Sequence, residues 1–390
     1  MQIVKRYLFD LIERQLETPE AIVITGMRRT GKTTLLEYFY DKISSKNKLK
    51  LDLENPLNRK YFETENYETI ISNFHTQGIN FDEKAYIFLD EIQYTKSIPS
   101  IVKYLIDHYQ VKFFLTGSAS FYLKNLFTES LSGRKYLFEL FPLSFEEFLW
   151  FKQSSLNIPA PGQKITSAIY GGFAPLYDEY IEYGGFPGVV LKSSAEDKKS
   201  ALQDIFTSFF QLEVIQLGDF KRNDTIRDLM LLLMHRIGSK LDIQKISREL
   251  GISRPTINEY VAFLEGTYFI KTIKPFSRGK DTEIRKASKV YICDCGLANC
   301  ITKIPVGSLF ENSVFQNLRL KGSLNYYQRK SGAEIDFIVN KDSAYEVKMN
   351  VHPSDINKLE KVSASIGLNN YNVIAKKHSD LDHIIYGFML

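Results

Sequence analysis

The chain has 390 residues, which at about 150 residues per domain predicts two or three domains. Hydrophobic residues make up 44% and charged residues 25%, so disorder, collagen and coiled coil are excluded as descriptions of the whole chain. The formal net charge is only +4, so any affinity for nucleic acid has to come from a local patch.

The first 150 residues alternate short apolar runs with helix-length amphipathic segments. The runs over residues 21–25, 86–89 and 112–116 are rich in isoleucine, valine, phenylalanine or leucine. Such alternation predicts an α/β fold in which helices cover both faces of a mostly parallel sheet.

A glycine-rich motif lies between the first of these runs and an expected helix over residues 34–40. It matches the phosphate-binding loop (P-loop) pattern G-x-x-x-x-G-K-[ST], whose backbone N–H groups bind phosphate oxygens. In that pattern the lysine lies between the β- and γ-phosphates and the hydroxyl residue ligates Mg²⁺. We therefore expect ATP and Mg²⁺ to bind here, and the nucleotide-binding residues are Gly26, Met27, Arg28, Arg29, Thr30, Gly31, Lys32, Thr33 and Thr34.

The second run ends in an acidic pair. Asp90 would hold Mg²⁺ through water at the carboxyl edge of the sheet, and Glu91 would accept a proton from the attacking water. An acidic pair after a strand is usually a solvated strand end, but about sixty residues after a P-loop it is a specific pairing.

Small polar residues and an arginine follow the third run. Thr116 or Ser118 could contact the γ-phosphate or the lytic water, although a simple turn explains each one equally well. Arg134 lies on an expected helical segment, where it is either a surface arginine or an arginine finger acting in cis or across a subunit boundary. The oligomeric state is left open, because no assembly segment is evident.

Residues 152–164 contain serine, asparagine, glycine and two prolines and predict a connection. A largely helical stretch follows to about residue 238. Residues 242–276 then have the order helix, short turn, helix and extended run, with Gly251 ending the first helix. This order is typical of a winged helix-turn-helix, which binds either DNA or another protein.

The segment after the winged helix is basic. Its seven lysines and arginines outnumber two acidic residues, which predicts a DNA-contact patch, although such loops also serve solubility. The basic residues are Lys271, Lys274, Arg278, Lys280, Arg285, Lys286 and Lys289.

The C-terminal region is expected to contain a hairpin with strands over residues 332–339 and 343–348. Because residues two apart on a strand share a face, Glu346 and Lys348 project together, and the short turn brings Asp336 beside them. Two carboxylates can bind Mg²⁺, and the lysine can position or deprotonate water for attack on a phosphodiester. A solvated strand face with alternating charges would need no such function.

Glu311, on an expected helix over residues 309–320, could add another acidic group to this site. The D…E-x-K arrangement resembles the core of the PD-(D/E)xK nucleases, with Ile335 in place of the usual proline. Basic and aromatic residues in the preceding segment, Tyr326 to Lys330, suit a phosphate backbone.

The P-loop GMRRTGKTT, the strand ends LDEIQ and LTGSAS, and the segment LSGR…LFPLSFEEF together resemble the prokaryotic AAA+-like ATPases whose C-terminal domain is of unknown function. Residues 183–187 match the GGFP motif of that family's lid, and residues 291–297 resemble its Y-x-x-D-x-G-L strand. The resemblance implies an ATPase with an additional-strand P-loop fold, a helical lid, a winged helix and a nuclease-like end.

The cysteines and the apolar stretches bear on location. Cys293, Cys295 and Cys300 cannot form a disulfide framework, and with no histidine near them in sequence they favour buried thiols over a metal site. The first residues lack the apolar core of a signal peptide, and residues 228–235 are too few to cross a bilayer. We therefore expect a cytoplasmic protein with no membrane partner.

Four regions are expected: an AAA+-like P-loop ATPase core over residues 1–150, a connection and helical lid over 151–224, a winged helix over 225–280 and a nuclease-like domain over 281–390. The expected function is a Mg²⁺-dependent ATPase that couples nucleotide state to a DNA-binding, nuclease-like C-terminal region. The alternative is a regulatory switch whose C-terminal half binds DNA or a partner protein without cleavage. The expected catalytic residues are Lys32, Glu91, Arg134, Asp336, Glu346 and Lys348, and the expected metal ligands are Thr33, Asp90, Asp336 and Glu346.

Overall fold

The computed structural model describes residues 3–64, 66–118, 131, 133–160, 162–218, 220, 222–277, 287–329 and 332–390. The chain divides into two compact units. Unit 1 comprises Met1–Phe141 with Gly266–Tyr268, and unit 2 comprises Pro142–Glu265 with Phe269–Leu390. The first unit therefore ends at Phe141, before the boundary expected at residue 150.

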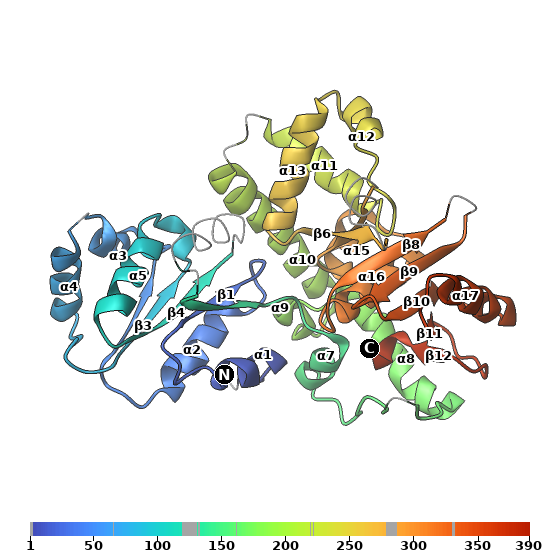
Figure 1. The fold of residues 1–390 in the computed structure, drawn as a ribbon, viewed down its shortest axis with the longest axis horizontal. Coiled ribbons are helices and arrows are strands. Elements are labelled where there is room, and N and C mark those ends of the chain that lie inside the picture. Colours follow the sequence, from blue (N-terminus) through green and yellow to red (C-terminus); the bar gives the residue numbers. More distant parts are fainter. Residues whose placement is uncertain are drawn as a thin grey trace. The chain divides into compact units, whose positions relative to one another are not determined.

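Unit 1 is built on a five-stranded parallel sheet with the order β2-β3-β4-β1-β5, which confirms the expected α/β fold (Figure 1). Strand β4 lies between β1, which precedes the P-loop, and β3, which precedes the acidic pair. This is the additional-strand order that the resemblance implies. The strands are β1 (Ala21–Thr25), β2 (Lys48–Asp52), β3 (Ala85–Asp90), β4 (Val111–Gly117) and β5 (Lys135–Glu139).

Two hydrophobic cores cover the two faces of this sheet. Ala21 and Val23 pack with α4 and α5 on one face, whereas Ile22 and Ile24 pack with α1 and α2 on the other. Burial on both faces explains why the strands are continuous apolar runs. The helices are α1 (Tyr7–Glu13), α2 (Lys32–Lys42), α3 (Pro56–Arg59), α4 (Tyr67–Thr76) and α5 (Ile98–His108), with short 3₁₀ turns at Lys60–Phe62 and Ile92–Tyr94.

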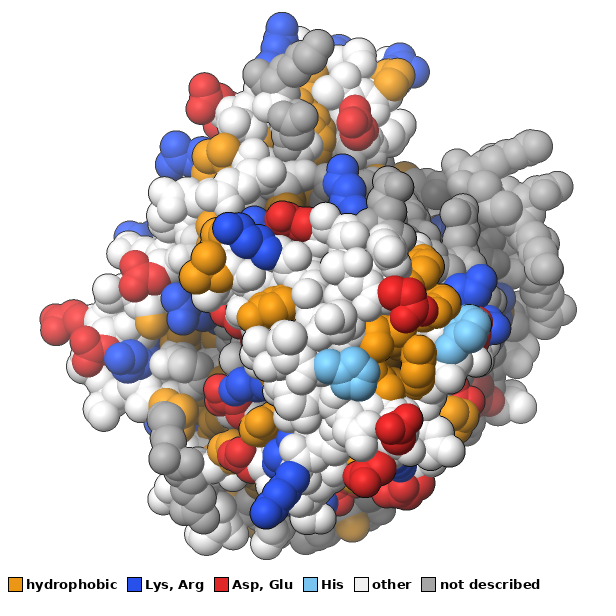
Figure 2. Space-filling view, turned by 90° about the vertical axis from the view of Figure 1, so that its left-hand side faces the viewer, with side chains coloured by type: hydrophobic (Ala, Val, Ile, Leu, Met, Phe, Trp, Pro, Cys, Tyr) orange, Lys and Arg blue, Asp and Glu red, His pale blue; other side chains and the backbone are white. Residues whose placement is uncertain are grey.

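The outer side of α4 and α5 has aromatic side chains on its surface. Tyr67 of α4 stacks on Tyr104 of α5 with ring centroids 4.2 Å apart, and Tyr104 in turn stacks on His108. Figure 2 views this side of the molecule, where a small group of hydrophobic side chains lies between two histidines among mixed charges. The charges seen there are of both signs and form no single-sign patch.

Unit 2 combines a helical part with a seven-stranded sheet of order β12-β11-β10-β9-β8-β6-β7. Its strands are β6 (Ile270–Pro275), β7 (Lys289–Ile292), β8 (Leu324–Gln328), β9 (Glu334–Val339), β10 (Ser343–Lys348), β11 (Asn370–Ala375) and β12 (Ile384–Tyr386). Its helices are α7 (Phe145–Phe151), α8 (Ser167–Tyr183), α9 (Pro187–Val190), α10 (Ala195–Phe209), a π-helix (Phe210–Leu217), α11 (Asn223–Met234), α12 (Ile243–Leu250), α13 (Arg254–Gly266), α15 (Cys295–Thr302), α16 (Val306–Leu318), α17 (Pro353–Ser365) and a 3₁₀ turn (Gly387–Met389).

The elements expected for a winged helix occur in order: α11, α12 and α13 precede the antiparallel pair β6 and β7. Strand β6 also pairs in parallel with β8, so this hairpin is part of the same sheet as β9 and β10. Assignment of these elements to a DNA-binding winged helix stays a prediction.

The two motifs of the lid and of the Y-x-x-D-x-G-L strand pack on each other inside unit 2. Asp294 accepts hydrogen bonds from the backbone N–H groups of Gly185 (2.7 Å) and Leu297 (3.0 Å). A Cβ on Gly296 would lie 2.0 Å from the carbonyl carbon of Tyr183, so only glycine fits at this approach. Packing of the two motifs on each other therefore explains why these glycines and Asp294 occur at these positions.

Cys293 and Cys295 are buried free thiols, which agrees with the simpler interpretation of the cysteines, and Cys300 is partly exposed. Burial raises the pKa of all three thiols. In the described part of the chain, no three histidine, cysteine or acidic side chains are arranged to hold a metal ion. Within the same residues, none of the helices has the length and apolar character needed to cross a membrane.

Candidate functional site

The P-loop lies between β1 and α2, as the motif predicts. A Cβ on Gly26 would lie 2.1 Å from the carbonyl oxygen of Leu140, so the loop can turn here only with glycine. Gly31 has a φ of 98° and precedes the first turn of α2. Lys32 is 4% exposed, and its ammonium donates to the carbonyl oxygens of Gly26 and Met27 at 3.0 Å each. The loop backbone and the lysine are thus held together.

Asp90 lies next to the P-loop hydroxyl. The Thr33 hydroxyl donates to Oδ2 of Asp90 at 2.7 Å, and the hydroxyl of Thr116, at the end of β4, donates to Oδ1. Burial raises the pKa of Asp90, and the two hydroxyl hydrogen bonds oppose that rise. Mg²⁺ prefers hard oxygen ligands, and a P-loop threonine with a neighbouring aspartate supplies them. These residues therefore fit the ion that the motif predicts.

Glu91 follows Asp90 in the left-handed region, with a φ of 53°, and its backbone N–H donates to Oδ1 of Asp90 at 3.1 Å. The amide of Gln93 donates to Oε2 of Glu91 and, at 2.9 Å, to the hydroxyl of Ser118. Burial raises the pKa of Glu91, but the positive charges of Lys32 and Arg28 lower it overall. Glu91 is therefore ionised at neutral pH and able to accept a proton.

Arg6 and Gln93 were not predicted from the sequence. Arg6 is 8% exposed, and its guanidinium donates to the carbonyl oxygens of Thr30 (3.1 Å) and Phe141 (2.9 Å). No local pattern identifies such a contact, because Arg6 lies far from both partners in sequence. Gln93 had a weak signal, since it lies within the LDEIQ segment directly after the acidic pair.

Arg134 is not positioned as a finger acting in cis. Its carbonyl oxygen accepts from the N–H of Ala21 at 2.9 Å, at the amino end of β1, and its Nε donates to Asp107 at 2.7 Å. The P-loop follows the opposite, carboxyl end of that strand, so this part of the hypothesis is wrong. Arg134 also lies just before β5 and not on a helix. A finger acting in trans stays a prediction.

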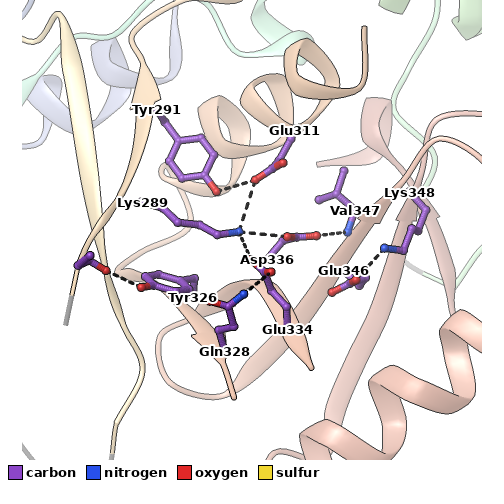
Figure 3. A network of polar contacts seen from close by, with 11 residues as sticks. Lys289, Tyr291, Glu311, Tyr326, Gln328, Glu334, Asp336, Glu346, Val347 and Lys348 are labelled. Carbon is purple, nitrogen blue, oxygen red and sulfur yellow. Dashed lines mark hydrogen bonds and ion pairs between the residues drawn. The ribbon is translucent and has the colours of Figure 1, made fainter. Parts of the chain in front are cut away.

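The expected C-terminal residues lie close together on β9 and β10 (Figure 3). Oδ2 of Asp336 accepts from the N–H of Val347 at 2.9 Å, and the Lys348 ammonium donates to Oε1 of Glu346 at 2.8 Å. Glu346 is only 7% exposed, and its Oε2 has no hydrogen-bond partner among the described residues. Burial and the charge of Asp336 raise the pKa of Glu346. The arrangement is observed, and the catalytic roles stay predictions.

A second lysine lies among these acids. Lys289, at the start of β7, places its ammonium 2.5 Å from Oε1 of Glu334, 3.3 Å from Oδ1 of Asp336 and 3.8 Å from Oε1 of Glu311. Its side chain is 4% exposed. Glu311, on α16, also accepts from the Tyr291 hydroxyl at 2.8 Å. Burial and the charge of Asp336 raise the pKa of Glu311.

The interpretation of Lys289 as a DNA contact is therefore wrong, because its ammonium is enclosed by carboxylates. Lys271 and Lys274 are exposed, and Lys271 pairs with Glu265 at 2.9 Å. Several residues named above lie outside the described residues. They are the other basic residues of that patch, three residues of the ATPase motifs (Ala119, Ser120 and Ser132) and Lys330. The basic residues of the patch that lie outside the described residues are Arg278, Lys280, Arg285 and Lys286.

Comparisons with known protein families agree with the geometry of unit 1. Residues 18–149 match a family model described as an AAA domain, which supports an ATPase of the AAA type. Two further models, described only as domains of unknown function, match residues 174–307 and 306–385. The nuclease-like resemblance of the C-terminal region thus has no support from the family models.

Similar full-length proteins are uncharacterized. One from Haemophilus influenzae is 29% identical over 372 residues, which cover 90% of this chain and 88% of that protein. One from Methanocaldococcus jannaschii is 27% identical over 390 residues, with 95% and 84% covered. Among solved structures, a Walker-type ATPase of Pyrococcus abyssi is similar with a TM-score of 0.46 and 16% identity, and the match covers 76% of this chain and 95% of that chain.

Proposed function

We propose that the chain hydrolyses ATP with Mg²⁺ at the P-loop of unit 1. The observation that supports this most directly is the hydrogen bond of 2.7 Å between the Thr33 hydroxyl and Asp90, at the end of a buried strand and beside the P-loop lysine. Thr33 and Asp90 would hold Mg²⁺, which neutralises charge on the phosphates. Lys32 would contact the β- and γ-phosphates.

Glu91 is the proposed general base. Its carboxylate is ionised and lies beside Gln93, whose amide also reaches Ser118 at the end of β4. We infer that Gln93 and Ser118 orient Glu91 and the water that attacks the γ-phosphate. The amide would fix the carboxylate, and the serine hydroxyl would supply a second polar contact for the water or the phosphate.

The test is Mg²⁺-dependent phosphate release by the full chain. Glu91→Gln is expected to bind ATP normally and to lose turnover by about 10²-fold or more, since general bases contribute that much. Lys32→Ala is expected to lose nucleotide binding itself. Lys42→Ala is a matched control, because Lys42 ends the same helix and contacts Glu13 and Tyr38, which lie outside the P-loop. Full turnover in Glu91→Gln would contradict the assignment of the base.

A second candidate function concerns unit 2, where one buried oxygen is informative. We propose that Asp336 and Glu346 hold a divalent ion through oxygens that include Oε2 of Glu346, which lacks a hydrogen-bond partner among the described residues. Such an ion would polarise a phosphodiester, and Lys348 would position or deprotonate the attacking water. The substrate would be DNA, bound in part by the predicted winged helix.

This second function is tested by incubating the chain with DNA, ATP and Mg²⁺ and following DNA cleavage and phosphate release together. Cleavage that Asp336→Ala abolishes, with ATP turnover unchanged, is the expected result. ATP turnover without cleavage would leave the regulatory alternative, in which unit 2 binds DNA or a partner protein. A variant of Asp336 that still cleaves would exclude the site altogether.

A further inference from the structure

The carboxylates of unit 2 surround a protein ammonium as well as the proposed divalent-ion site. The Lys289 ammonium lies within 4 Å of oxygens of three acids from two elements: Glu311 on α16, and Glu334 and Asp336 on β9 (Figure 3). Three partly buried carboxylates so close together repel one another unless a cation lies between them. An ammonium at their centre supplies one positive charge and blocks that position.

The backbone fixes Lys289 in this place. Lys289 pairs with Ile273 across β6 and β7, and it forms an isolated antiparallel bridge with Lys240. Its ammonium also lies 5.5 Å from the ring centre of Tyr326, on β8, whose hydroxyl is bonded to the Ala287 carbonyl. The lysine is thus held by strands on both sides and by a cation–π contact.

Two of the carboxylates around Lys289 accept further hydrogen bonds. Oε1 of Glu311 accepts from Tyr291 at 2.8 Å, and Oε2 of Glu334 accepts from the amide of Gln328 at 3.1 Å. In contrast, Oε2 of Glu346 has no partner among the described residues, and Oδ2 of Asp336 accepts a hydrogen bond from the Val347 N–H. The oxygens open to an ion therefore lie on the Glu346 side of Asp336.

The formal charge of the acidic cluster also favours a single divalent ion. Four carboxylates, Glu311, Glu334, Asp336 and Glu346, face two ammonium groups, Lys289 and Lys348, which leaves a formal charge of −2 in a largely buried cluster. One divalent ion would neutralise that remainder, whereas two would leave an uncompensated positive charge. Buried charges without compensation are costly, so the cluster suits one ion.

We propose that the Lys289 ammonium is a built-in cation that occupies the position between Glu311, Glu334 and Asp336, so that unit 2 binds a single divalent ion between Asp336 and Glu346. This inference rests on the ion site of the second proposed function but does not depend on DNA cleavage. The position of Lys289 would limit the site to one divalent ion, and Lys348 and that ion would together activate the water. Removing Lys289 would release Glu311 and Glu334 as ligands for a second ion.

The test is the number of Mn²⁺ ions bound by the full chain without nucleotide, measured by electron paramagnetic resonance of free Mn²⁺. The wild-type chain is expected to bind one ion more than Asp336→Asn and one more than Glu346→Gln. Lys289→Met is expected to bind one ion more than the wild type. Lys289→Arg keeps the charge and is expected to match the wild type.

Lys240→Met is the matched control for a general change of charge. Lys240 is exposed, its ammonium lies 5.9 Å from the ring centre of Tyr326, and it is the bridge partner of Lys289. Among the described residues, it forms no ion pair with the acids of the cluster. It is expected to leave the ion count unchanged. A gain of one ion in Lys240→Met as well would overturn a specific role for Lys289.

Lys289→Met leaves three acids without their cation, so it could fail to fold without metal. The double variant Lys289→Met/Glu311→Gln removes one of those charges and also one ligand of the second ion, so it is expected to bind no more ions than the wild type. An unchanged ion count in Lys289→Met, refolded with Mn²⁺ where needed, overturns the inference, as does a loss of two ions in Asp336→Asn. If Asp336→Asn and Glu346→Gln remove no ion at all, the divalent site of the proposed function fails instead.

Discussion

Gly26 is the residue at which the P-loop tolerates least change. A Cβ there would meet the backbone oxygen of Leu140 at 2.1 Å, and a backbone atom cannot rotate away as a side chain can. We expect Gly26→Ala to lower ATP affinity at least tenfold and to destabilise unit 1 by about 2 kcal/mol. Titration with a fluorescent ATP analogue and thermal unfolding would measure the two effects.

The matched control is Gly171→Ala, because Gly171 lies within α8 and an added Cβ would meet no atom within 4 Å. This control is expected to be neutral or slightly stabilising, since alanine favours a helix. Equal losses of ATP affinity in both variants would refute the close approach to Leu140 as the cause.

Arg6 is a second single-residue determinant of the loop. Because its guanidinium donates to the carbonyls of Thr30 and Phe141, Arg6→Met would leave one buried and one partly buried acceptor without this donor. We expect a loss of about 1–3 kcal/mol in the stability of unit 1 and weaker ATP binding. Lys5→Met, next to it and 54% exposed, is expected to change neither property by a measurable amount.

At the scale of elements, strand β4 carries a buried lysine, Lys112, whose hydrogen bonds hold the segment before β1 in place. The Lys112 ammonium donates to the carbonyl oxygens of Gln15 (2.6 Å), Thr18 (2.8 Å) and Glu20 (2.7 Å). Burial lowers the pKa of Lys112 to about 8. The unfolded chain, with the ordinary pKa of 10.5, therefore binds more protons than the folded chain between these two values.

It follows that Lys112 penalises the folded state fully below pH 8 and that the penalty is relieved as the pH rises toward 10.5. We expect the stability of the wild type relative to Lys112→Met to increase over that range. Parallel denaturant unfolding of both proteins from pH 7 to pH 10.5 would measure the difference. A difference that falls or stays constant with pH would contradict the burial of a titrating lysine at this position.

The sequence predicted the elements that local patterns specify. The strands before the P-loop and the acidic pair, the loop itself and the hairpin of β9 and β10 all follow from short motifs or from two-residue periodicity. Even the turn of that hairpin, expected around residues 340–342, has Asn340 and Lys341 in the left-handed region. These features depend on contacts close in sequence.

The incorrect expectations concern contacts between distant segments. The basic segment around Lys289 predicts a DNA contact, whereas acids on α16 and β9 enclose its ammonium. The motif around Arg134 predicts a place near the nucleotide, whereas the parallel pairing of β5 with β1 puts Arg134 at the amino edge of the sheet. In both cases the pairing partners of a strand, which no local pattern identifies, decide where the side chain lies.

At the scale of the whole molecule, the proposed function predicts that the nucleotide state of unit 1 affects unit 2. Residues 184–187 match the lid motif, and their Gly185 N–H is bonded to Asp294 inside unit 2. We propose that a change at this segment transmits the nucleotide state to the C-terminal elements. The segment is suited to that role because the hydrogen bond from the Gly185 N–H to Asp294 ties it to the strand-to-helix junction before α15, so that a movement of the segment would reach that junction.

The prediction is that ATP alters DNA binding by the full chain in Glu91→Gln, which retains the bound nucleotide, and has no effect in Lys32→Ala, which loses it. Asp294→Ala is expected to uncouple DNA binding from the nucleotide state. This variant would keep ATP turnover and lose the nucleotide-dependent change in DNA affinity. Fluorescence anisotropy of labelled DNA, with and without ATP, would measure the coupling, whose usual size is about 1–3 kcal/mol. A nucleotide-dependent change that persists in Lys32→Ala would mean that ATP acts elsewhere on the chain, because a ligand shifts an equilibrium only through a site that distinguishes its two states.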